Sequence, residues 1–186
     1  MLKSAFQSTT LRTAGFYSIP QQDLAEASKF MSICYMFIGG SPASTAGGIK
    51  TVTLGVIILL VINYIKGRSE THIFHKNITR GAVKRAIVVF TISVFIVISA
   101  TWLLLITDGV HLSFMDIIFE VVSSFATVGL TLGATTKLSL AGRLIIMMLM
   151  IIGRLGPITI SIALFKKHKE IKQTKVQYPN GNVLIG

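Results

Sequence analysis

FMSICYMFIGGSPASTAGGIKTVTLGVIILLVINYI, residues 30–65, is an apolar stretch of 36 residues with one charge, Lys50. A membrane-crossing helix needs roughly 20 apolar residues, so this stretch is too long to cross as one unbroken helix. Its centre, residues 39–48, holds four glycines and a proline, which break helices. We therefore expect two half-helices around a loop at membrane depth. Irregular backbone is tolerated there only where it lines a water-filled cavity or is packed in protein, which favours a functional constriction over a passive kink.

The composition is typical of an all-α integral membrane protein. Of the 186 residues, 52% are hydrophobic and 13% charged, with a mean hydropathy of +0.71; few soluble domains have such values. Residues 86–107 carry no charge and residues 144–165 carry only Arg154, so each can cross a membrane. Residues 112–125 are apolar but too short to cross, so we expect a re-entrant helix.

The basic residues indicate the orientation of the chain. The net charge is +11, and 11 of the 18 Lys and Arg residues lie within residues 66–85 and 166–175. Short basic segments beside membrane spans mark the cytoplasmic side. No aromatic residues alternate with these charges as in a nucleic-acid site, so we expect no nucleic-acid partner. Both patches are cytoplasmic if residues 30–65 cross inward, 86–107 outward and 144–165 inward, which makes the C-terminus cytoplasmic.

Two short runs, Thr13-Ala14-Gly15-Phe16 and Thr127-Val128-Gly129-Leu130, lie 114 residues apart. Each is followed, 24 residues beyond its glycine, by another glycine, Gly39 or Gly153. A glycine-containing peptide can turn its carbonyls toward one point, where they replace the water around a cation. Glycine admits the unusual dihedral angles that this requires. The shared spacing predicts one structural unit used twice, each with a cation filter.

Arginine side chains lie near these features. Arg154 is central in its expected span, where an arginine costs about 2.5–3.5 kcal/mol, so it should face the protein interior. At the 114-residue offset it matches Gly40, and we hypothesise that it hydrogen-bonds carbonyls of the glycine-rich loop and holds or gates it. The alternative is an arginine satisfied by any nearby carbonyls. Arg12 either tunes the field at the filter or packs behind it against a carboxylate such as Glu120.

Catalysis is not expected. The sequence holds no arrangement of nucleophile and base, and no Cys/His cluster at metal-ligand spacing. We expect neither an enzyme nor a covalently bound cofactor.

Several stretches resemble the Ktr/Trk/HKT superfamily of potassium transporters, and KtrB-like bacterial members most closely. The stretches are residues 10–16, 39–51, 124–130 and 153–157. The resemblance spans nearly the whole chain, and the glycine-rich loop followed by Ile49-Lys50-Thr51 is its most specific part. Such proteins have four helix–pore-helix–helix repeats in one chain around a pseudo-fourfold pore.

By this resemblance the chain is the last half of such a protein. Residues 86–165 would be a complete repeat, and residues 1–65 the end of the preceding repeat, without its first span and most of its pore helix. Residues 66–85 would be a cytoplasmic loop and residues 166–186 a cytoplasmic tail. Four filter segments are needed to surround an ion, and the chain supplies two. We therefore expect a gene fragment, a truncated sequence or half of a split protein that does not conduct alone.

The resemblance also implies a set of site residues. The backbone carbonyls that bind potassium would be those of Thr13, Ala14, Gly15, Ala126, Thr127, Val128 and Gly129. The intramembrane gate loop below the filter would comprise Gly39, Gly40, Ser41, Pro42, Ser44, Thr45, Gly47 and Gly48. Arg154 would face this loop.

The implied substrate is K⁺, taken up across the bacterial plasma membrane, with Na⁺ as a coupling ion. The implied partners are membrane lipid, the remaining pore repeats, a second copy in a homodimer and a cytosolic nucleotide-binding regulatory ring (KtrA-like).

Two alternatives remain open at this point. A secondary transporter would bind its substrate at the ends of broken helices near the midplane. That requires binding side chains near the break, where residues 39–48 offer mainly Ser and Thr. A non-conducting membrane remnant or interaction subunit is the other alternative, favoured by the missing repeats.

Overall fold

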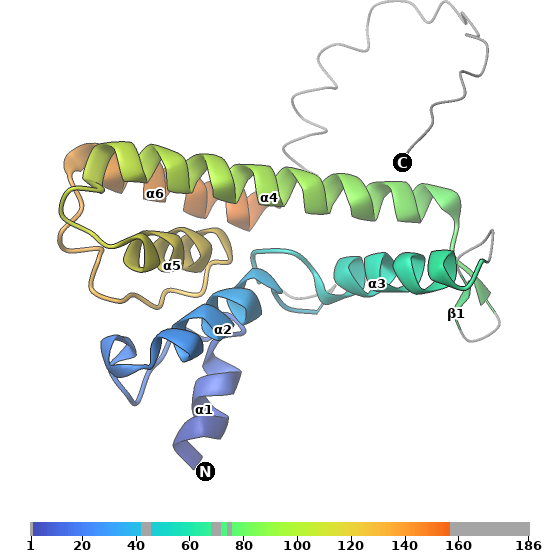
Figure 1. The fold of residues 1–186 in the computed structure, drawn as a ribbon, viewed down its shortest axis with the longest axis horizontal. Coiled ribbons are helices and arrows are strands. Elements are labelled where there is room, and N and C mark those ends of the chain that lie inside the picture. Colours follow the sequence, from blue (N-terminus) through green and yellow to red (C-terminus); the bar gives the residue numbers. More distant parts are fainter. Residues whose placement is uncertain (1, 42–45, 68–71, 74–75, 157–186) are drawn as a thin grey trace, which may run out of the picture.

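The computed structural model describes residues 2–41, 46–67, 72–73 and 76–156. The regular elements among these residues are helices, apart from one hairpin of two-residue strands (Figure 1). In chain order the elements are α1 (Leu2–Thr10), a 3₁₀ turn η1 (Gln21–Asp23), α2 (Glu26–Phe37), α3 (Thr51–Ile65), β1 (His72–Ile73), β2 (Lys76–Asn77), α4 (Arg80–Asp108), α5 (Phe114–Phe125) and α6 (Leu140–Leu155). The expected all-α class is confirmed. The hairpin lies within the basic segment 66–85, with its strands antiparallel.

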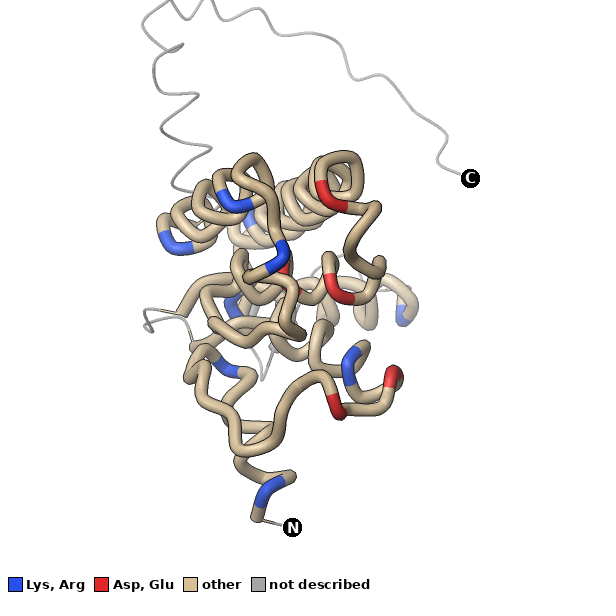
Figure 2. Tube along the Cα trace, turned by 90° about the vertical axis from the view of Figure 1, so that its left-hand side faces the viewer, with Lys and Arg blue, Asp and Glu red and all other residues tan. Residues whose placement is uncertain are grey.

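Helix α4 is the longest element. Its 29 residues extend about 43 Å, enough to cross a bilayer. Among the described residues it is the one helix long and apolar enough to span a membrane, whereas the apolar α3 is shorter, with 15 residues. The expected span 144–165 is described only as far as residue 156. Charged residues are sparse along the trace (Figure 2).

The apolar stretch from residue 30 onward is broken, as its glycines and proline predict. Helix α2 ends at Phe37 and α3 begins at Thr51. The two ends of the intervening segment are joined, because the N–H of Gly39 donates to the carbonyl of Ile49 (2.8 Å) and the N–H of Ile49 donates to that of Phe37 (3.2 Å). The chain at residues 37–39 therefore lies beside the chain at Ile49, just before α3 begins.

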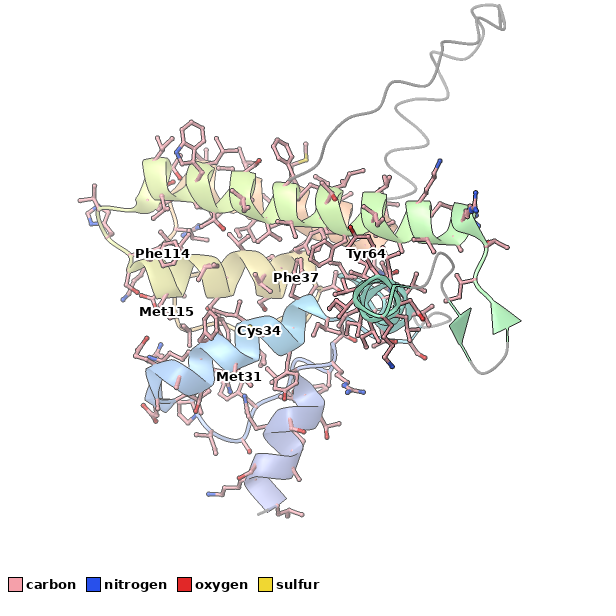
Figure 3. The ribbon with its side chains drawn as sticks, turned by 45° about the vertical axis from the view of Figure 1, so that its right-hand side comes forward. Met31, Cys34, Phe37, Tyr64, Phe114 and Met115 are labelled. Carbon is pink, nitrogen blue, oxygen red and sulfur yellow. The ribbon has the colours of Figure 1, made fainter. Side chains whose placement is uncertain are left out.

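Helix α5 forms the centre of the packing. It contacts α2, α4 and α6 (Figure 1), and most of its side chains are buried, including Phe119, Val121 and Phe125. Phe37, at the end of α2, packs its ring against Phe125, with 6.3 Å between centroids, and against Phe90 of α4, with 6.4 Å (Figure 3). A 12-residue helix is too short to cross a membrane, and neighbouring helices cover it.

The outer faces of α4 and α6 are apolar. Phe95, Ile98 and Trp102 of α4 and Met148 and Ile151 of α6 are exposed. Such contiguous apolar surface is a liability in water, but it is the surface that lipid or further membrane helices require.

Arg154 lies at the C-terminal end of α6. Helix α6 ends at Leu155, and Gly156 takes a φ of 80°. Arg154 therefore lies in the last turn of α6, and residues 157–165 of the expected span lie outside the described residues. The residue after Gly156 is Pro157, and a proline disfavours the helical conformation of the residue before it.

A buried carboxylate joins α4 to α6. Asp108, at the end of α4, accepts hydrogen bonds from the N–H of Ser139 (2.7 Å), the hydroxyl of Ser139 (3.1 Å) and the hydroxyl of Thr107 (2.9 Å). Ser139 caps α6 by accepting the N–H of Gly142 (3.1 Å).

Replacing Asp108 with Ala should therefore lower the thermal unfolding temperature of the purified protein. A buried hydrogen bond to a charged group contributes about 1.5–3 kcal/mol. Asp23→Ala, at an exposed carboxylate, is the control and should change stability by less than about 0.5 kcal/mol. Equal unfolding temperatures for the two variants would show that the hydrogen bonds between Asp108 and Ser139 do not contribute to stability.

Candidate functional site

The two glycine-containing runs have the same unusual backbone. Thr13 and Gly15 have φ values of 67° and 74°, and Thr127 and Gly129 have values of 57° and 86°. Among the described residues, the two threonines are the only non-glycine residues with positive φ. A β-branched residue rarely takes this conformation, which costs about 1–3 kcal/mol and is found mainly where function requires it. The repeat predicted from spacing therefore recurs in the backbone angles.

The N–H groups of each run bond back to the helix before it. The N–H of Ala14 donates to the carbonyl of Thr10 (3.2 Å), and the N–H of Val128 donates to that of Ser123 (2.9 Å). Within the described residues, no hydrogen bond reaches the carbonyl oxygens of the seven predicted filter residues, Thr13, Ala14, Gly15, Ala126, Thr127, Val128 and Gly129. In each run, N–H groups are thus hydrogen-bonded to the preceding helix, whereas the carbonyl oxygens accept no hydrogen bond within the described residues.

The two runs lie against each other. A Cβ placed on Gly15 would collide with the carbonyl oxygen of Val128 and lie 3.9 Å from the Cα of Gly129. Only glycine permits this approach of two backbones. Segments separated by more than a hundred residues therefore bring their carbonyl-bearing backbone to one place.

The glycine-rich loop contacts the second run directly. The N–H of Gly47 donates to Oγ1 of Thr127 (3.0 Å). A Cβ on Gly47 would lie 2.8 Å from this side chain, and a Cβ on Gly48 would lie 3.4 Å from the Cβ of Ala126. The loop and the run are thus in van der Waals contact.

The rest of the loop is partly described. A Cβ on Gly39 would collide with the carbonyl of Gly47, and the carbonyl of Gly40 accepts the N–H of Thr51 (3.3 Å). Ser41 is exposed. Lys50 donates from Nζ to the carbonyl of Ala46 (2.8 Å). Pro42, Ser44 and Thr45 lie outside the described residues.

Helix α6 reaches the same point through Gly153. A Cβ on Gly153 would collide with the carbonyl oxygen of Phe125, the last residue of α5. The next residue, Arg154, is exposed in the last turn of α6. The backbone of α6 beside Arg154 therefore contacts the last residue of α5, and the glycine-rich loop contacts the next two residues, Ala126 and Thr127.

Helix α5 is oriented with its C-terminal end at the second run. Its N-terminus is closed by a capping box, in which the N–H of Asp116 donates to Ser113 Oγ (3.2 Å) and the N–H of Ser113 donates to Asp116 Oδ2 (3.3 Å). Its C-terminus is capped by Ala126, beside Thr127. A helix C-terminus carries a partial negative charge, so this end favours a cation.

The left-handed conformation of Thr13 and Thr127 was not predicted from the sequence, although their matched positions, two residues before Gly15 and Gly129, are a usable signal. The suggested packing of Arg12 against Glu120 is wrong. Arg12 is exposed and forms no ion pair with Glu120, which bonds to Thr131 and Thr135 within the described residues.

Comparison with known proteins places the chain in a family. Residues 1–175 match the model of the TrkH family, described as cation transport proteins. The chain belongs to this family, as the resemblance predicted, and it is therefore a membrane protein.

Among individual members of this family, the chain is similar to proteins named as potassium uptake proteins. The chain is 41% identical over 183 residues to the Ktr system potassium uptake protein B of Bacillus subtilis, covering 98% of this chain and 40% of that protein. It is 37% identical to the potassium/sodium uptake protein NtpJ of Enterococcus hirae, covering 97% and 40%. It is 34% identical to the Ktr system potassium uptake protein B of Vibrio alginolyticus, covering 100% and 39%.

The chain therefore spans about 40% of the length of these curated relatives. They are named as uptake proteins and not as enzymes, which agrees with the expectation that the chain is not an enzyme.

Replacing Gly47 with Ala should destabilise the protein, because the added methyl group would lie 2.8 Å from the Thr127 side chain and 2.9 Å from the backbone of Ala126. Overpacking of this kind costs about 1–3 kcal/mol. Gly55→Ala is the control, because no atom lies within 4 Å of its added methyl group. Thermal unfolding of both variants checks the contact, and a Gly47→Ala protein as stable as Gly55→Ala would contradict it.

Proposed function

We propose that the chain supplies two filter segments and the gate loop of a transporter that takes up K⁺ across the bacterial plasma membrane. The observation that carries this proposal is the set of carbonyls of the two adjoining runs, which accept no hydrogen bond within the described residues although their neighbouring N–H groups do donate. A dehydrated potassium ion needs oxygen ligands in place of its hydration shell, and backbone carbonyls provide them.

The backbone angles support carbonyl binding. In each run a residue with negative φ lies between two with positive φ. In an extended strand successive carbonyls point to opposite sides, whereas alternating left- and right-handed residues allow successive carbonyls to face one side. The C-terminal end of α5 adds a partial negative charge beside Thr127.

The helix order fits a pore repeat. We assign α4, α5 and α6 as first span, re-entrant pore helix and second span, and α1, α2 and α3 as a partial repeat. Helix α1 has nine residues and α5 has twelve. If α1 is the pore helix of the partial repeat, most of that helix is present, whereas the sequence pattern predicted that most of it is missing.

We infer that the loop at residues 39–48 is the gate. It bonds to Thr127 through Gly47, so displacing the loop breaks a contact with the filter itself. Arg154 is assigned as the residue that faces this loop, because its neighbour Gly153 contacts the C-terminal end of α5.

Two runs do not surround an ion, so further filter segments complete the site. The relatives named as Ktr system proteins support a multi-component assembly, and we include in the proposal a second copy, bound lipid and a cytosolic nucleotide-binding ring. The name of the Enterococcus hirae relative includes sodium, which supports Na⁺ as a coupling ion. The basic segments 66–85 and 166–175 would face the cytoplasm.

Replacing Gly129 with Ala tests the filter in the complete transporter that contains this sequence. No atom lies within 4 Å of the added methyl group, so the change acts through the positive φ alone. We expect K⁺-limited growth of a transporter-deficient strain to fail and Rb⁺ uptake to fall.

Gly67→Ala is the matched control, because Gly67 also has positive φ and open space around it but lies outside the runs. It imposes a similar backbone strain. Equal uptake by the two variants would sink the filter assignment, as would a wild-type transporter that does not move K⁺ or Rb⁺.

Replacing Arg154 with Gln tests the gate assignment. If Arg154 holds the loop closed, its loss should raise the basal K⁺ flux, and a tenfold rise corresponds to about 1.4 kcal/mol. Arg143→Gln, in the first turn of α6 and exposed, is the control. Flux and ion dependence unchanged by Arg154→Gln would discard the gating role and leave a structural arginine.

A further inference from the structure

Glu120 is a buried carboxylate that the filter and gate do not use. It lies in α5, is 4% exposed and forms no ion pair within the described residues. Its two oxygens accept hydrogen bonds from Thr131 Oγ1 (2.7 Å) and Thr135 Oγ1 (2.5 Å). Burying a carboxylate is costly unless hydrogen bonds satisfy it, and an apolar residue would fill a helix core at lower cost.

The two threonines follow the second run. Thr131 is two residues beyond Gly129, and its Oγ1 also accepts the N–H of Gly133 (3.0 Å). The carboxylate therefore ties the helix before the run to the segment after it. The run between them, with its left-handed Thr127 and Gly129, is fixed at both ends.

A second tie occurs in the first unit. Gln7 of α1 donates from Nε2 to Oε1 of Gln21 (2.6 Å), and Gln21 donates from Nε2 to Oε1 of Gln7 (3.2 Å). Gln21 is buried and lies 114 residues before Thr135. Gln7 precedes the first run and Gln21 follows it. Both runs are thus spanned by a side-chain bridge from the preceding helix to the following segment.

The two bridges differ in charge but share a hydrogen bond across the run. One bridge uses a carboxylate and the other uses two neutral amides, so the feature they share is the hydrogen bond across the run. The segments after the runs also meet, because a Cβ on Gly133 would collide with the Gln22 side chain. The segments that the two bridges tie to their helices are therefore also in contact with each other.

We propose that Glu120 and Gln7 are positioning residues that hold the two runs in their left-handed geometry and so set the preference for K⁺ over Na⁺. This inference rests on the proposed potassium filter. The residues act through Thr131, Thr135 and Gln21 and do not touch the ion. A filter held less firmly adapts to the smaller ion and loses discrimination.

The test measures Rb⁺ and Na⁺ uptake by the complete transporter carrying Glu120→Ala, Glu120→Gln, Gln7→Ala or Thr131→Ser. Glu120→Ala and Gln7→Ala should lower the Rb⁺ over Na⁺ preference about fivefold or more, the factor for one lost hydrogen bond. Glu120→Gln should keep most of the preference, because an amide forms the bridge in the first unit. Thr131→Ser retains its hydroxyl and should match the wild type.

Other outcomes overturn the proposal. If Glu120→Gln and Glu120→Ala weaken the apparent affinity for both ions equally and leave the preference unchanged, the carboxylate acts through its charge. If all variants lose expression or stability but keep the preference, the bridges are only structural. A wild-type transporter without Rb⁺ uptake would refute the proposed function itself, which distinguishes that failure from failure of the bridges.

Thermal unfolding of the purified transporter in K⁺ and in Na⁺ tests ion preference for variants whose expression in cells is too low for uptake measurements. Thermal unfolding of the purified wild-type transporter should shift upward in K⁺ more than in Na⁺, because a bound ligand stabilises the folded state. In Glu120→Ala the difference between the unfolding temperatures in K⁺ and in Na⁺ should be smaller than in the wild type. A Glu120→Ala protein that retains the wild-type difference between the salts would contradict the proposal.

Discussion

Backbone contact around the C-terminal end of α5 is the constraint on which the rest of the structure depends. Gly15, Gly47 and Gly153 come from three distant parts of the chain, and each lies so close to residues 125–128 that a Cβ would collide or overpack there. Since backbones cannot approach this closely through side chains, glycine is required at each position. This convergence places the two runs, the glycine-rich loop and α6 at one point.

The strained backbone needs external support. Thr13 and Thr127 each cost about 1–3 kcal/mol in their left-handed conformations, and a surrounding structure must hold them. Hydrogen bonds to the preceding helices secure one side of each run, and the side-chain bridges from Gln7 and Glu120 reach the segment beyond. For the second run, the buried apolar face of α5 supplies the rigid body to which these bonds attach.

The sequence predicts those features that depend on local composition. The break at residues 39–48 follows from its glycines and proline. The short helix α5 follows from the apolar run at residues 112–125, which is too short to cross a membrane. Matched spacing identifies the two runs. Contacts between distant residues, such as Gly47 with Thr127, depend on tertiary packing and leave no local signal. The left-handed threonines oppose their intrinsic preference, so local composition does not predict their conformation.

The central claim is that carbonyls of the two runs together bind a dehydrated alkali cation. Anomalous scattering from Rb⁺ in crystals of the complete transporter measures this directly. We expect an Rb⁺ peak between the backbones near Gly15 and Gly129, at bonding distance from their carbonyl oxygens. A peak elsewhere in the pore, with these oxygens turned away from it, would contradict the assignment of the two runs as filter segments.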